Sequence, residues 1–130
     1  MNIGQAARNS GVSAKMIRYY ERIGLIPEAR RTANGYRVYA DADIHTLKFI
    51  RRARDLGFSI EQIDQLVQLW QNQQRASAEV KQIALQHVSA LDHKIEQLRT
   101  IRETLSHLAQ HCQGNARPDC PILEDLARGG

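Results

Sequence analysis

Apolar positions in the first 22 residues follow two short helical periods that a glycine separates. Ile3, Ala6 and Ala7 share one side of the first segment, and Gly11 supplies a position that tolerates positive φ. Ser13 comes next, and its hydroxyl can cap the following helix. The pattern predicts a helix, a tight turn and a second helix, although any two short helices in a small bundle would produce a similar pattern.

The second of these helices has an apolar side and a cationic side. The residues near its packing side or at its edge are Val12, Met16, Ile17 and Tyr20. The residues that project outward or flank that side are Lys15, Arg18, Tyr19 and Arg22. Arg and Lys bind guanine acceptors or phosphates, and Tyr reaches backbone oxygens, so this face suits the major groove of DNA. Periodicity does not distinguish the side chains that contact bases from those that contact phosphates.

Residues 30–39 predict a β-hairpin. Asn34 and Gly35 stand between two short runs of strand-compatible residues, and this dipeptide favours a type I′ turn, in which both central residues have positive φ. The basic and aromatic residues of the hairpin are Arg30, Arg31, Tyr36, Arg37 and Tyr39. Because two strands are marginally stable alone, we expect the hairpin to lean on the helices and to lie along the phosphate backbone as a basic wing.

Two more amphipathic helices follow the hairpin. The first runs from about residue 41 to 56, and Gly57 ends it; its apolar positions are Ile44, Leu47, Ile50 and Ala53. Ser59 and Gln62 form a capping box for the second, whose stripe is Ile60, Ile63, Leu66, Val67 and Trp70. We assign these stripes to the core. Arg51, Arg52 and Arg54 would make either a second phosphate-contacting corner or a solvated basic face.

A long helical seam occupies the next part of the chain. Polar residues 71–77 separate it from the first domain, and Ser77 is placed to cap it. Residues 78–111 contain no Pro or Gly, and apolar residues recur four and three apart, with Arg102 as the one interruption, at Ala84, Val88, Leu91, Ile95, Leu98, Leu105 and Ala109. At 1.5 Å per residue this helix is about 50 Å long, so its seam needs a partner helix. We therefore predict a homodimer through a two-helix coiled coil.

The positive charge of the chain belongs to its first half. Residues 1–58 contain 11 Lys or Arg against 5 Asp or Glu, whereas residues 59–130 contain 7 against 9. Such a distribution indicates a nucleic-acid surface, or, less specifically, a surface for acidic partners. Neither a signal peptide nor a run of 18 apolar residues is present, so we expect no membrane association and a reducing, cytoplasmic location.

Cys112 and Cys120 follow the long helix. One pair of cysteines is poor evidence for a secreted disulfide scaffold, and a closed zinc site would need a second pair of Cys or His ligands. A two-thiolate metal site and two thiols without a function both remain open. Soft thiolates select Cu(I), Ag(I) and Au(I), which accept low coordination numbers. Pro121 is suited to the first position of a short helix, which would place Cys120 at the end where the helix dipole stabilises a thiolate.

Two histidines could extend this site. His107 and His111 lie four residues apart, on one helical face, and with both cysteines they could form a tetrahedral site for zinc or cadmium. Alternatively, they are solvated or interfacial histidines near a helix C-terminus. A third possibility is a thiol-redox regulator, in which Cys112 and Cys120 form a reversible disulfide.

Several segments together resemble the MerR family of bacterial transcriptional regulators. They are the helix-turn-helix that continues into IRYYERIGLI, the NGYRVY wing, the GFSIEQI helix pair and the long helix. The two cysteines with DCPI, together with Ser77, are similar to the copper-efflux regulator (CueR-like) branch, because divalent-metal sensors tend to have Cys at the position of Ser77. The resemblance implies a sensor of Cu(I), Ag(I) or Au(I) in which Cys112 and Cys120 are the ligands.

The resemblance also implies partners and roles. Members of the family are not enzymes; they are homodimers with an antiparallel coiled coil that bind a palindromic promoter operator in double-stranded DNA and activate RNA polymerase by distorting the DNA. By position, Lys15, Arg18 and Tyr20 belong to the recognition helix, and Arg31, Tyr36 and Arg37 to the wing. Ser77 and Lys81 would lie beside the metal, with Lys81 as a counter-charge from the partner subunit.

We therefore expect a mainly α fold. Residues 1–70 form a winged helix-turn-helix DNA-binding domain, 71–77 a connector, 78–111 the dimerisation helix, and 112–130 a metal-binding loop with a short C-terminal helix.

Overall fold

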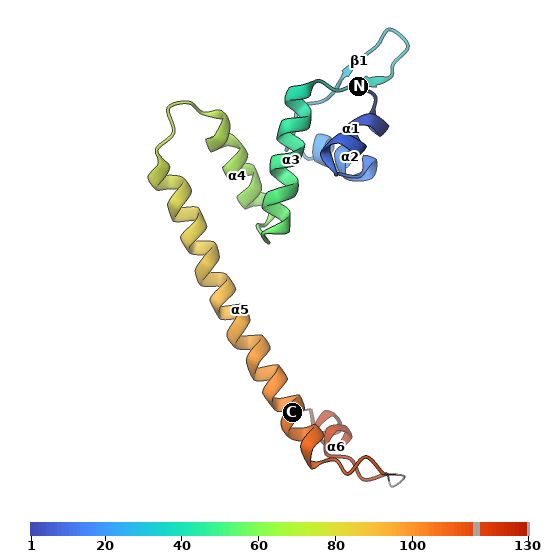
Figure 1. Ribbon diagram of the computed structural model, residues 1–130, viewed down its shortest axis with the longest axis vertical. Helices are drawn as coiled ribbons and strands as arrows, with labels where there is room; N and C mark the ends of the chain where they lie inside the picture. The colour runs from blue at the N-terminus through green and yellow to red at the C-terminus, as the bar shows by residue number, and fades with distance from the viewer. Residues whose placement is uncertain (116–117, 130) are drawn as a thin grey trace. The chain divides into compact units, whose positions relative to one another are not determined.

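The computed structural model describes residues 1–115 and 118–129. Its elements in chain order are α1 (Ile3–Ser10), α2 (Ala14–Arg22), β1 (Arg30–Arg31), β2 (Arg37–Val38), α3 (Asp41–Asp55), α4 (Ile60–Gln71), α5 (Ser77–His111) and α6 (Pro121–Arg128), as Figure 1 shows. The chain divides into two compact units, residues 1–83 and 84–130, which are described separately. The mainly α fold is confirmed. In the described ranges we find no helix with the length and apolarity needed to cross a membrane.

The helix-turn-helix has the predicted local structure. The Asn2 side chain accepts the backbone N–H of Gln5 at 2.8 Å and caps α1, and Gly11 ends that helix with φ 75° in the left-handed region. Ser13 then caps α2 by accepting the N–H of Met16 at 3.2 Å. Because such caps are local interactions, the sequence was sufficient to predict the turn at Gly11 and the start of α2 at Ser13, although the Asn2 cap was not predicted.

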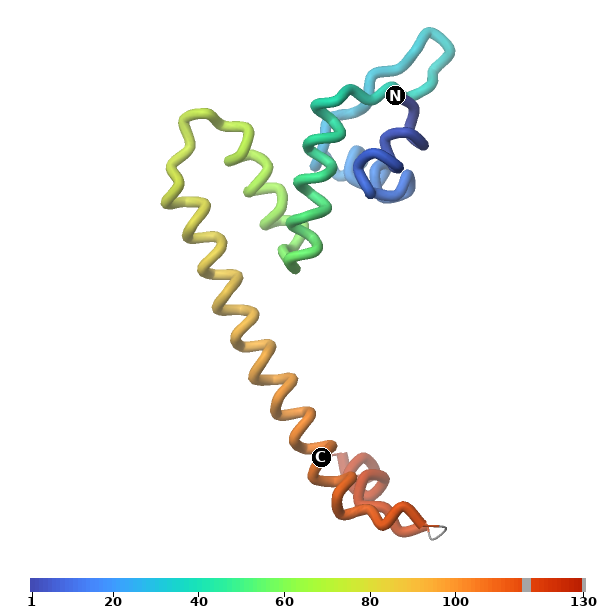
Figure 2. Tube along the Cα trace, in the orientation of Figure 1, coloured from blue at the N-terminus to red at the C-terminus, as the bar shows by residue number. Residues whose placement is uncertain are grey.

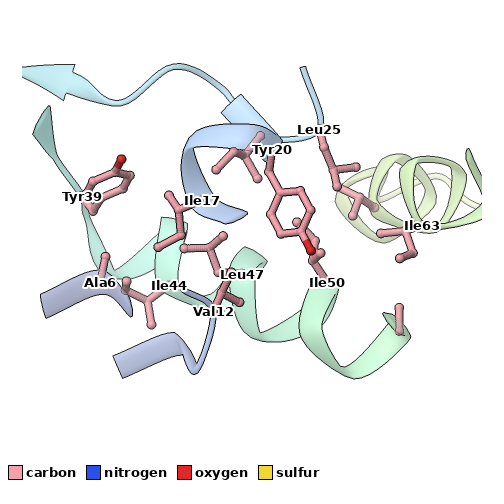
Figure 3. Close-up of a cluster of buried hydrophobic side chains, with 13 residues drawn as sticks. Ala6, Val12, Ile17, Tyr20, Leu25, Tyr39, Ile44, Leu47, Ile50 and Ile63 are labelled. Carbon is pink, nitrogen blue, oxygen red and sulfur yellow. The ribbon is translucent and has the colours of Figure 1, made fainter. Parts of the chain in front are cut away.

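The core of the first unit joins α1, α2, α3 and α4. Its largest fully buried side chains are Tyr20, Ile17, Leu47, Ile50 and Ile63, which converge in Figure 3 with Ala6 and Val12 from the helix-turn-helix. The apolar stripe of α3 is therefore core, as expected, whereas of the α4 stripe Ile63 and Val67 are buried and Trp70 is 39% exposed. At the other end of α4 the Trp70 ring stacks on Phe49 of α3, with centroids 4.4 Å apart and an interplanar angle of 9°.

The hairpin forms, but its turn differs from the predicted type. β1 and β2 pair antiparallel, with Arg30 opposite Val38 and Arg31 opposite Arg37. The Thr32 N–H donates to the Tyr36 carbonyl at 2.8 Å, and the Gly35 N–H donates to the Thr32 carbonyl at 2.9 Å. Of the described residues, only glycines have positive φ, so Asn34 cannot be the first central residue of a type I′ turn. The loop is instead three residues long, with Gly35 (φ 82°) in the left-handed position.

α5 is one uninterrupted helix of 35 residues, about 52 Å long (Figure 2). Ser77 is its first residue rather than the cap before it. The apolar side chains along its length are exposed in this single chain; they include Leu85, Val88, Leu91, Ile95, Leu98, Ile101 and Leu105. This is the surface that a second copy would cover in the predicted dimer.

Candidate DNA-binding surface and metal centre

The outward face of α2 is cationic. Ile17 and Tyr20 anchor the helix in the core, which leaves Lys15, Arg18 and Arg22 exposed. The Arg22 guanidinium lies 5.4 Å from the centre of the Tyr19 ring, within the range of a cation–π contact. A shallow hollow of about 360 Å³ runs along this face, between the cationic side chains, Met16 and Tyr19. The three exposed cations on this helix can donate hydrogen bonds to phosphate oxygens and to the acceptor atoms on guanine edges.

Tyr20 does not belong to that face. Its side chain is 0% exposed, and its hydroxyl accepts a hydrogen bond from Arg54 Nη1 at 2.8 Å. The packing pattern had placed Tyr20 on the buried side, whereas the family resemblance had placed it among the DNA-binding residues; the structure agrees with the packing pattern. Arg54, which is exposed, is the group of this pair that a ligand can reach.

The predicted wing residues have different environments. Tyr36 is 72% exposed at the hairpin loop, and the exposed Arg31 donates from Nη1 to the Gly35 carbonyl at 2.8 Å. Arg37 is half-buried, and its Nε lies 3.2 Å from Oε2 of Glu21 on α2. Arg31 and Tyr36 therefore present a surface to solvent, whereas Arg37 holds the hairpin against α2.

Glu21 connects α2 to β2 and to the residue that follows β2, and this role was not predicted from the sequence. Its side chain is 6% exposed; it pairs with Arg37 and accepts a hydrogen bond from the Tyr39 hydroxyl. Burial, followed by this hydrogen bond and the charge of Glu21, raises the pKa of Tyr39 well above its ordinary value. The Tyr39 N–H in turn donates to the Met1 carbonyl at 2.7 Å. The carboxylate thus fixes the strand end of the hairpin relative to the recognition helix.

The two cysteines lie side by side in the second unit. Their Sγ atoms are 3.8 Å apart, which is too far for a disulfide bond of about 2.04 Å, and both thiols are free and half-buried. Cys112 follows the last residue of α5, and Cys120 is the N-cap of α6. The chain reversal between the two helices brings together sulfurs that are eight residues apart in sequence. Two thiols at this separation fit a single soft metal ion.

The start of α6 favours the thiolate form of Cys120. Pro121 occupies the first turn of the helix, as predicted, and the backbone amides of this turn have no acceptors within the helix because they lie at its start. The Leu123 N–H, and then the Ile122 N–H and the Cys112 thiol, lower the pKa of the Cys120 thiol from its ordinary value, although desolvation and Glu124 oppose them. A metal-binding thiol must lose its proton, so this position is suited to a ligand.

The histidines do not complete a four-ligand site. The His107 and His111 rings meet edge to face with centroids 4.3 Å apart. Within residues 1–115 and 118–129, however, no three His, Cys, Asp or Glu side chains form a group that could hold a metal ion. The Cys2His2 arrangement is therefore not assembled in this structure.

Ser77 and Lys81, the two residues expected beside the metal in a dimer, are exposed in the first turns of α5. They belong to the first unit and the cysteines to the second, so their role depends on a second copy and stays a prediction.

Comparison with known proteins agrees with this organisation. The profile described as MerR HTH family regulatory protein matches residues 1–70, and the profile described as MerR, DNA binding matches residues 44–108. The HTH-type transcriptional regulator HmrR of Sinorhizobium medicae (strain WSM419) is 60% identical over 130 residues, covering 100% of this chain and 88% of that protein. CueR of Escherichia coli O157:H7 is 40% identical over 127 residues, covering 98% and 94%.

Among solved structures, the chain is similar to the transcription regulator PbrR691 from Ralstonia metallidurans CH34 in complex with lead(II). The TM-score is 0.84 and the sequence identity 28%, over 97% of this chain and 98% of that one. The profiles, the relatives and the structure all describe transcription regulators, not enzymes. The chain belongs to the MerR family of helix-turn-helix transcriptional regulators.

Proposed function

We propose that this metal-responsive regulator senses a monovalent coinage metal, Cu(I), Ag(I) or Au(I), through Cys112 and Cys120. The observation that carries the proposal is the pair of free thiols 3.8 Å apart, in a part of the chain where the described residues offer no further cluster of ligands. Two sulfurs satisfy an ion that accepts low coordination, whereas a zinc ion would be two ligands short.

The relatives support a role in heavy-metal sensing, but they do not specify copper as the metal. HmrR at 60% identity is similar to this chain over more positions than CueR at 40%, and PbrR691 was crystallised with lead(II). Assignment to the copper-efflux branch therefore rests on this chain's own residues. Ser77 offers no third thiolate, so divalent ions lack the ligand that a Cys at this position would supply.

We propose the remaining features of the mechanism from the family resemblance. Two copies pair through α5 as an antiparallel coiled coil, bind a palindromic operator and act on RNA polymerase by distorting promoter DNA, at copper efflux or detoxification genes. The exposed apolar length of α5 and the cationic face of α2 support this arrangement. Lys81 of the partner subunit would balance part of the negative charge of two thiolates that bind one monovalent ion.

The direct test is an anaerobic metal titration of the reduced protein in the presence of a competing chelator. We expect one Cu(I) or Ag(I) for each pair of cysteines, bound far more tightly than Zn(II). Replacing both histidines, His107→Ala with His111→Ala, should leave this affinity nearly unchanged. If zinc competes effectively and the double variant loses it, the sensor is divalent and the histidines are ligands.

The proximity of the thiols also supports a second candidate, a redox-responsive regulator. Closing the 3.8 Å gap between the Sγ atoms to a bond would require only local movement. This candidate predicts transcription that responds to a peroxide or a disulfide oxidant without added metal, whereas the proposed sensor requires the metal and reduced thiols.

A further inference from the structure

Each thiol of the Cys112/Cys120 pair projects from backbone that a helix end holds in place. The Cys112 N–H donates to the Ala109 carbonyl at 3.2 Å, at the end of α5. The Cys120 carbonyl accepts the Glu124 N–H at 3.0 Å, at the start of α6. Because both cysteines have hydrogen-bonded backbone, a ligand that joins the sulfurs across their 3.8 Å separation orders little of the chain that is not already ordered.

The pair offers two soft donors, and the described residues add no third. Both thiols are free, and each is exposed enough to be reached by a small molecule. His107 and His111 are exposed, and their rings contact each other edge to face. Within residues 1–115 and 118–129, no group of three His, Cys, Asp or Glu side chains is present. The site therefore satisfies a ligand that forms two bonds to sulfur and needs no further donor.

Monosubstituted trivalent arsenicals, RAs(OH)2, have this requirement. Trivalent arsenic is soft and bonds preferentially to thiolate sulfur. Its bond to carbon does not exchange, so the two hydroxyls are the groups that thiols replace. The bonds at arsenic are pyramidal, so two sulfurs on one arsenic are close neighbours, as the sulfurs of this pair are. Arsenite, As(OH)3, has three exchangeable hydroxyls instead and needs a third thiolate for its full affinity.

We propose that Cys112 and Cys120 together bind monosubstituted trivalent arsenicals and that the adduct excludes the metal. Each sulfur forms one As–S bond, each As–OH bond breaks, and the two hydroxyls leave as water with the two thiol protons. Arsenic stays trivalent, so the reaction needs no oxidant or reductant. The exclusion rests on the proposed function, because the same thiols hold the metal there, whereas the adduct itself depends only on the thiol pair.

The second As–S bond gives the pair its advantage over separate thiols. Once one sulfur has bound arsenic, the other lies beside it, and its effective concentration exceeds that of a thiol in solution. Glutathione at millimolar concentration should therefore remove an arsenical from a lone cysteine much more readily than from this pair.

The adduct differs from the metal-bound site in charge. Two thiolates that bind one monovalent ion keep a net negative charge, whereas two thiolates that bind an RAs group are neutral. The adduct therefore lacks the charge that Lys81 of the partner subunit would balance in the proposed sensor, and both sulfurs are occupied. We expect an arsenical to block the metal response rather than to imitate it.

The test uses the full-length reduced protein under anaerobic conditions. The probe is phenylarsine oxide, which water converts to the phenyl member of this class, and arsenite is tested in parallel. Glutathione is then titrated into the loaded protein. After small molecules are removed, mass spectrometry measures the arsenic that the protein retains, and a colorimetric thiol reagent counts the free cysteines.

Three variants separate a paired site from ordinary thiol reactivity. Cys112→Ser and Cys120→Ser each leave one thiol. The matched control combines Cys120→Ser with Ser89→Cys, which keeps two thiols in each chain but places them about 34 Å apart along α5. Ser89 is exposed, so a thiol at this position is accessible. Circular dichroism and sedimentation confirm that each variant folds and assembles as the parent does.

We expect the parent to retain one phenylarsenic group per chain, with both thiols consumed. Releasing it should take about a hundredfold more glutathione than releasing it from any of the three variants. Arsenite should leave the parent at a much lower glutathione concentration than the phenyl compound does. The loaded parent should bind no Ag(I) and should give no metal-triggered transcription.

Three results would overturn the proposal. Equal retention by the parent and the separated-thiol control would show ordinary thiol reactivity. Arsenite retained as firmly as the phenyl compound would show a third ligand. Transcription triggered by the arsenical alone would make it an inducer. Failure of the proposed metal function is a distinct outcome: the unloaded parent would then bind neither Cu(I) nor Ag(I), although it retained the arsenical.

Discussion

The side chain of Glu21 shows how a single buried carboxylate organises a cationic surface. It belongs to α2, forms an ion pair with Arg37 and accepts a hydrogen bond from the Tyr39 hydroxyl. A buried carboxylate that loses a donor keeps its desolvation cost, so each of these contacts matters more for stability than an exposed ion pair does.

Removing the Tyr39 hydroxyl tests this network. We expect Tyr39→Phe to lower the free energy of unfolding by about 2 kcal/mol, because the hydrogen bond that it removes has a charged acceptor. Urea unfolding followed by circular dichroism measures the change. Tyr36→Phe removes the same atom from a tyrosine that is 72% exposed, and it should have almost no effect. Equal stability of the two variants would contradict a stabilising role for the contact.

The same contact predicts a pH dependence. The raised pKa keeps Tyr39 protonated in the folded protein at a pH where an unfolded tyrosine, with a pKa of about 10, ionises. The stability difference between the parent and Tyr39→Phe should therefore be constant below about pH 10 and shrink above it. Urea unfolding at a series of alkaline pH values measures this difference.

We expect variants of Arg18 and Arg31 to distinguish base recognition from phosphate binding. Arg18→Ala removes an exposed cation of α2, and we expect binding to the palindromic operator to weaken by about 1 to 3 kcal/mol while binding to random duplex changes less. Arg31→Ala in the hairpin should weaken both to a similar extent. Titrations at fixed salt measure these affinities; identical losses of site preference would contradict the division. Arg37→Ala would be a less specific test of the hairpin, because it would also leave Glu21 buried without its cation.

At the scale of elements, the sequence correctly predicted the structural features that depend on residues close together in the chain. Three helix starts lie where the sequence predicted them, at the caps Ser13 and Ser59 and at the proline that begins α6. Each of these signals acts within one helical turn. The prediction of a type I′ turn in the hairpin was wrong, because the dipeptide Asn-Gly does not by itself determine the length of the loop. The pairing of Thr32 with Tyr36 extends the ladder and moves only Gly35 to positive φ.

Among the candidate site residues, too, the sequence predicted features that depend on local spacing and missed those that depend on distant partners. Lys15 and Arg18 are exposed as helical periodicity predicted, whereas the partners of Glu21 come from 16 and 18 residues along the chain. No local pattern identifies such pairs, because a glutamate on an amphipathic helix is usually exposed. The two cysteines were recognised by residue type, but the 3.8 Å separation of their sulfurs depends on how α6 folds back.

The seam of α5 provides a test of the proposed dimer. Leu98 is 64% exposed in the single chain, so Leu98→Glu should scarcely change a monomer. In a coiled coil both copies would lose a buried leucine, about 3 to 6 kcal/mol in total, which weakens association roughly a hundredfold or more. Sedimentation equilibrium measures the change, with Gln97→Glu as the control on the same helix. Unaltered association would place the interface elsewhere.

At the scale of the whole molecule, the proposed metal ligands and the proposed DNA-binding residues belong to different units. The cations of α2 and the hairpin lie within residues 1–83, and both thiols lie within residues 84–130. We expect Cys112→Ser or Cys120→Ser to abolish metal-triggered transcription while operator affinity stays close to that of the parent, because a hydroxyl replaces a soft ligand far along the chain from the DNA-binding residues. Loss of dimerisation in either variant would indicate a structural role.

The converse change adds a ligand. Ser77→Cys should raise the affinity for divalent ions relative to Cu(I) if this position of one subunit faces the thiols of the other in the dimer. Competition titrations with Zn(II) measure the ratio, and an unchanged ratio would show that residue 77 lies away from the metal.

The stacking of Trp70 on Phe49 gives the chain a built-in optical probe. Trp70 is the one tryptophan in the sequence, and it reports on the junction of α3 and α4. Its emission will shift when the DNA-binding unit loosens and will be insensitive to melting confined to residues 84–130. Fluorescence read beside helical ellipticity would therefore show, without any label, whether the two units unfold together or in sequence.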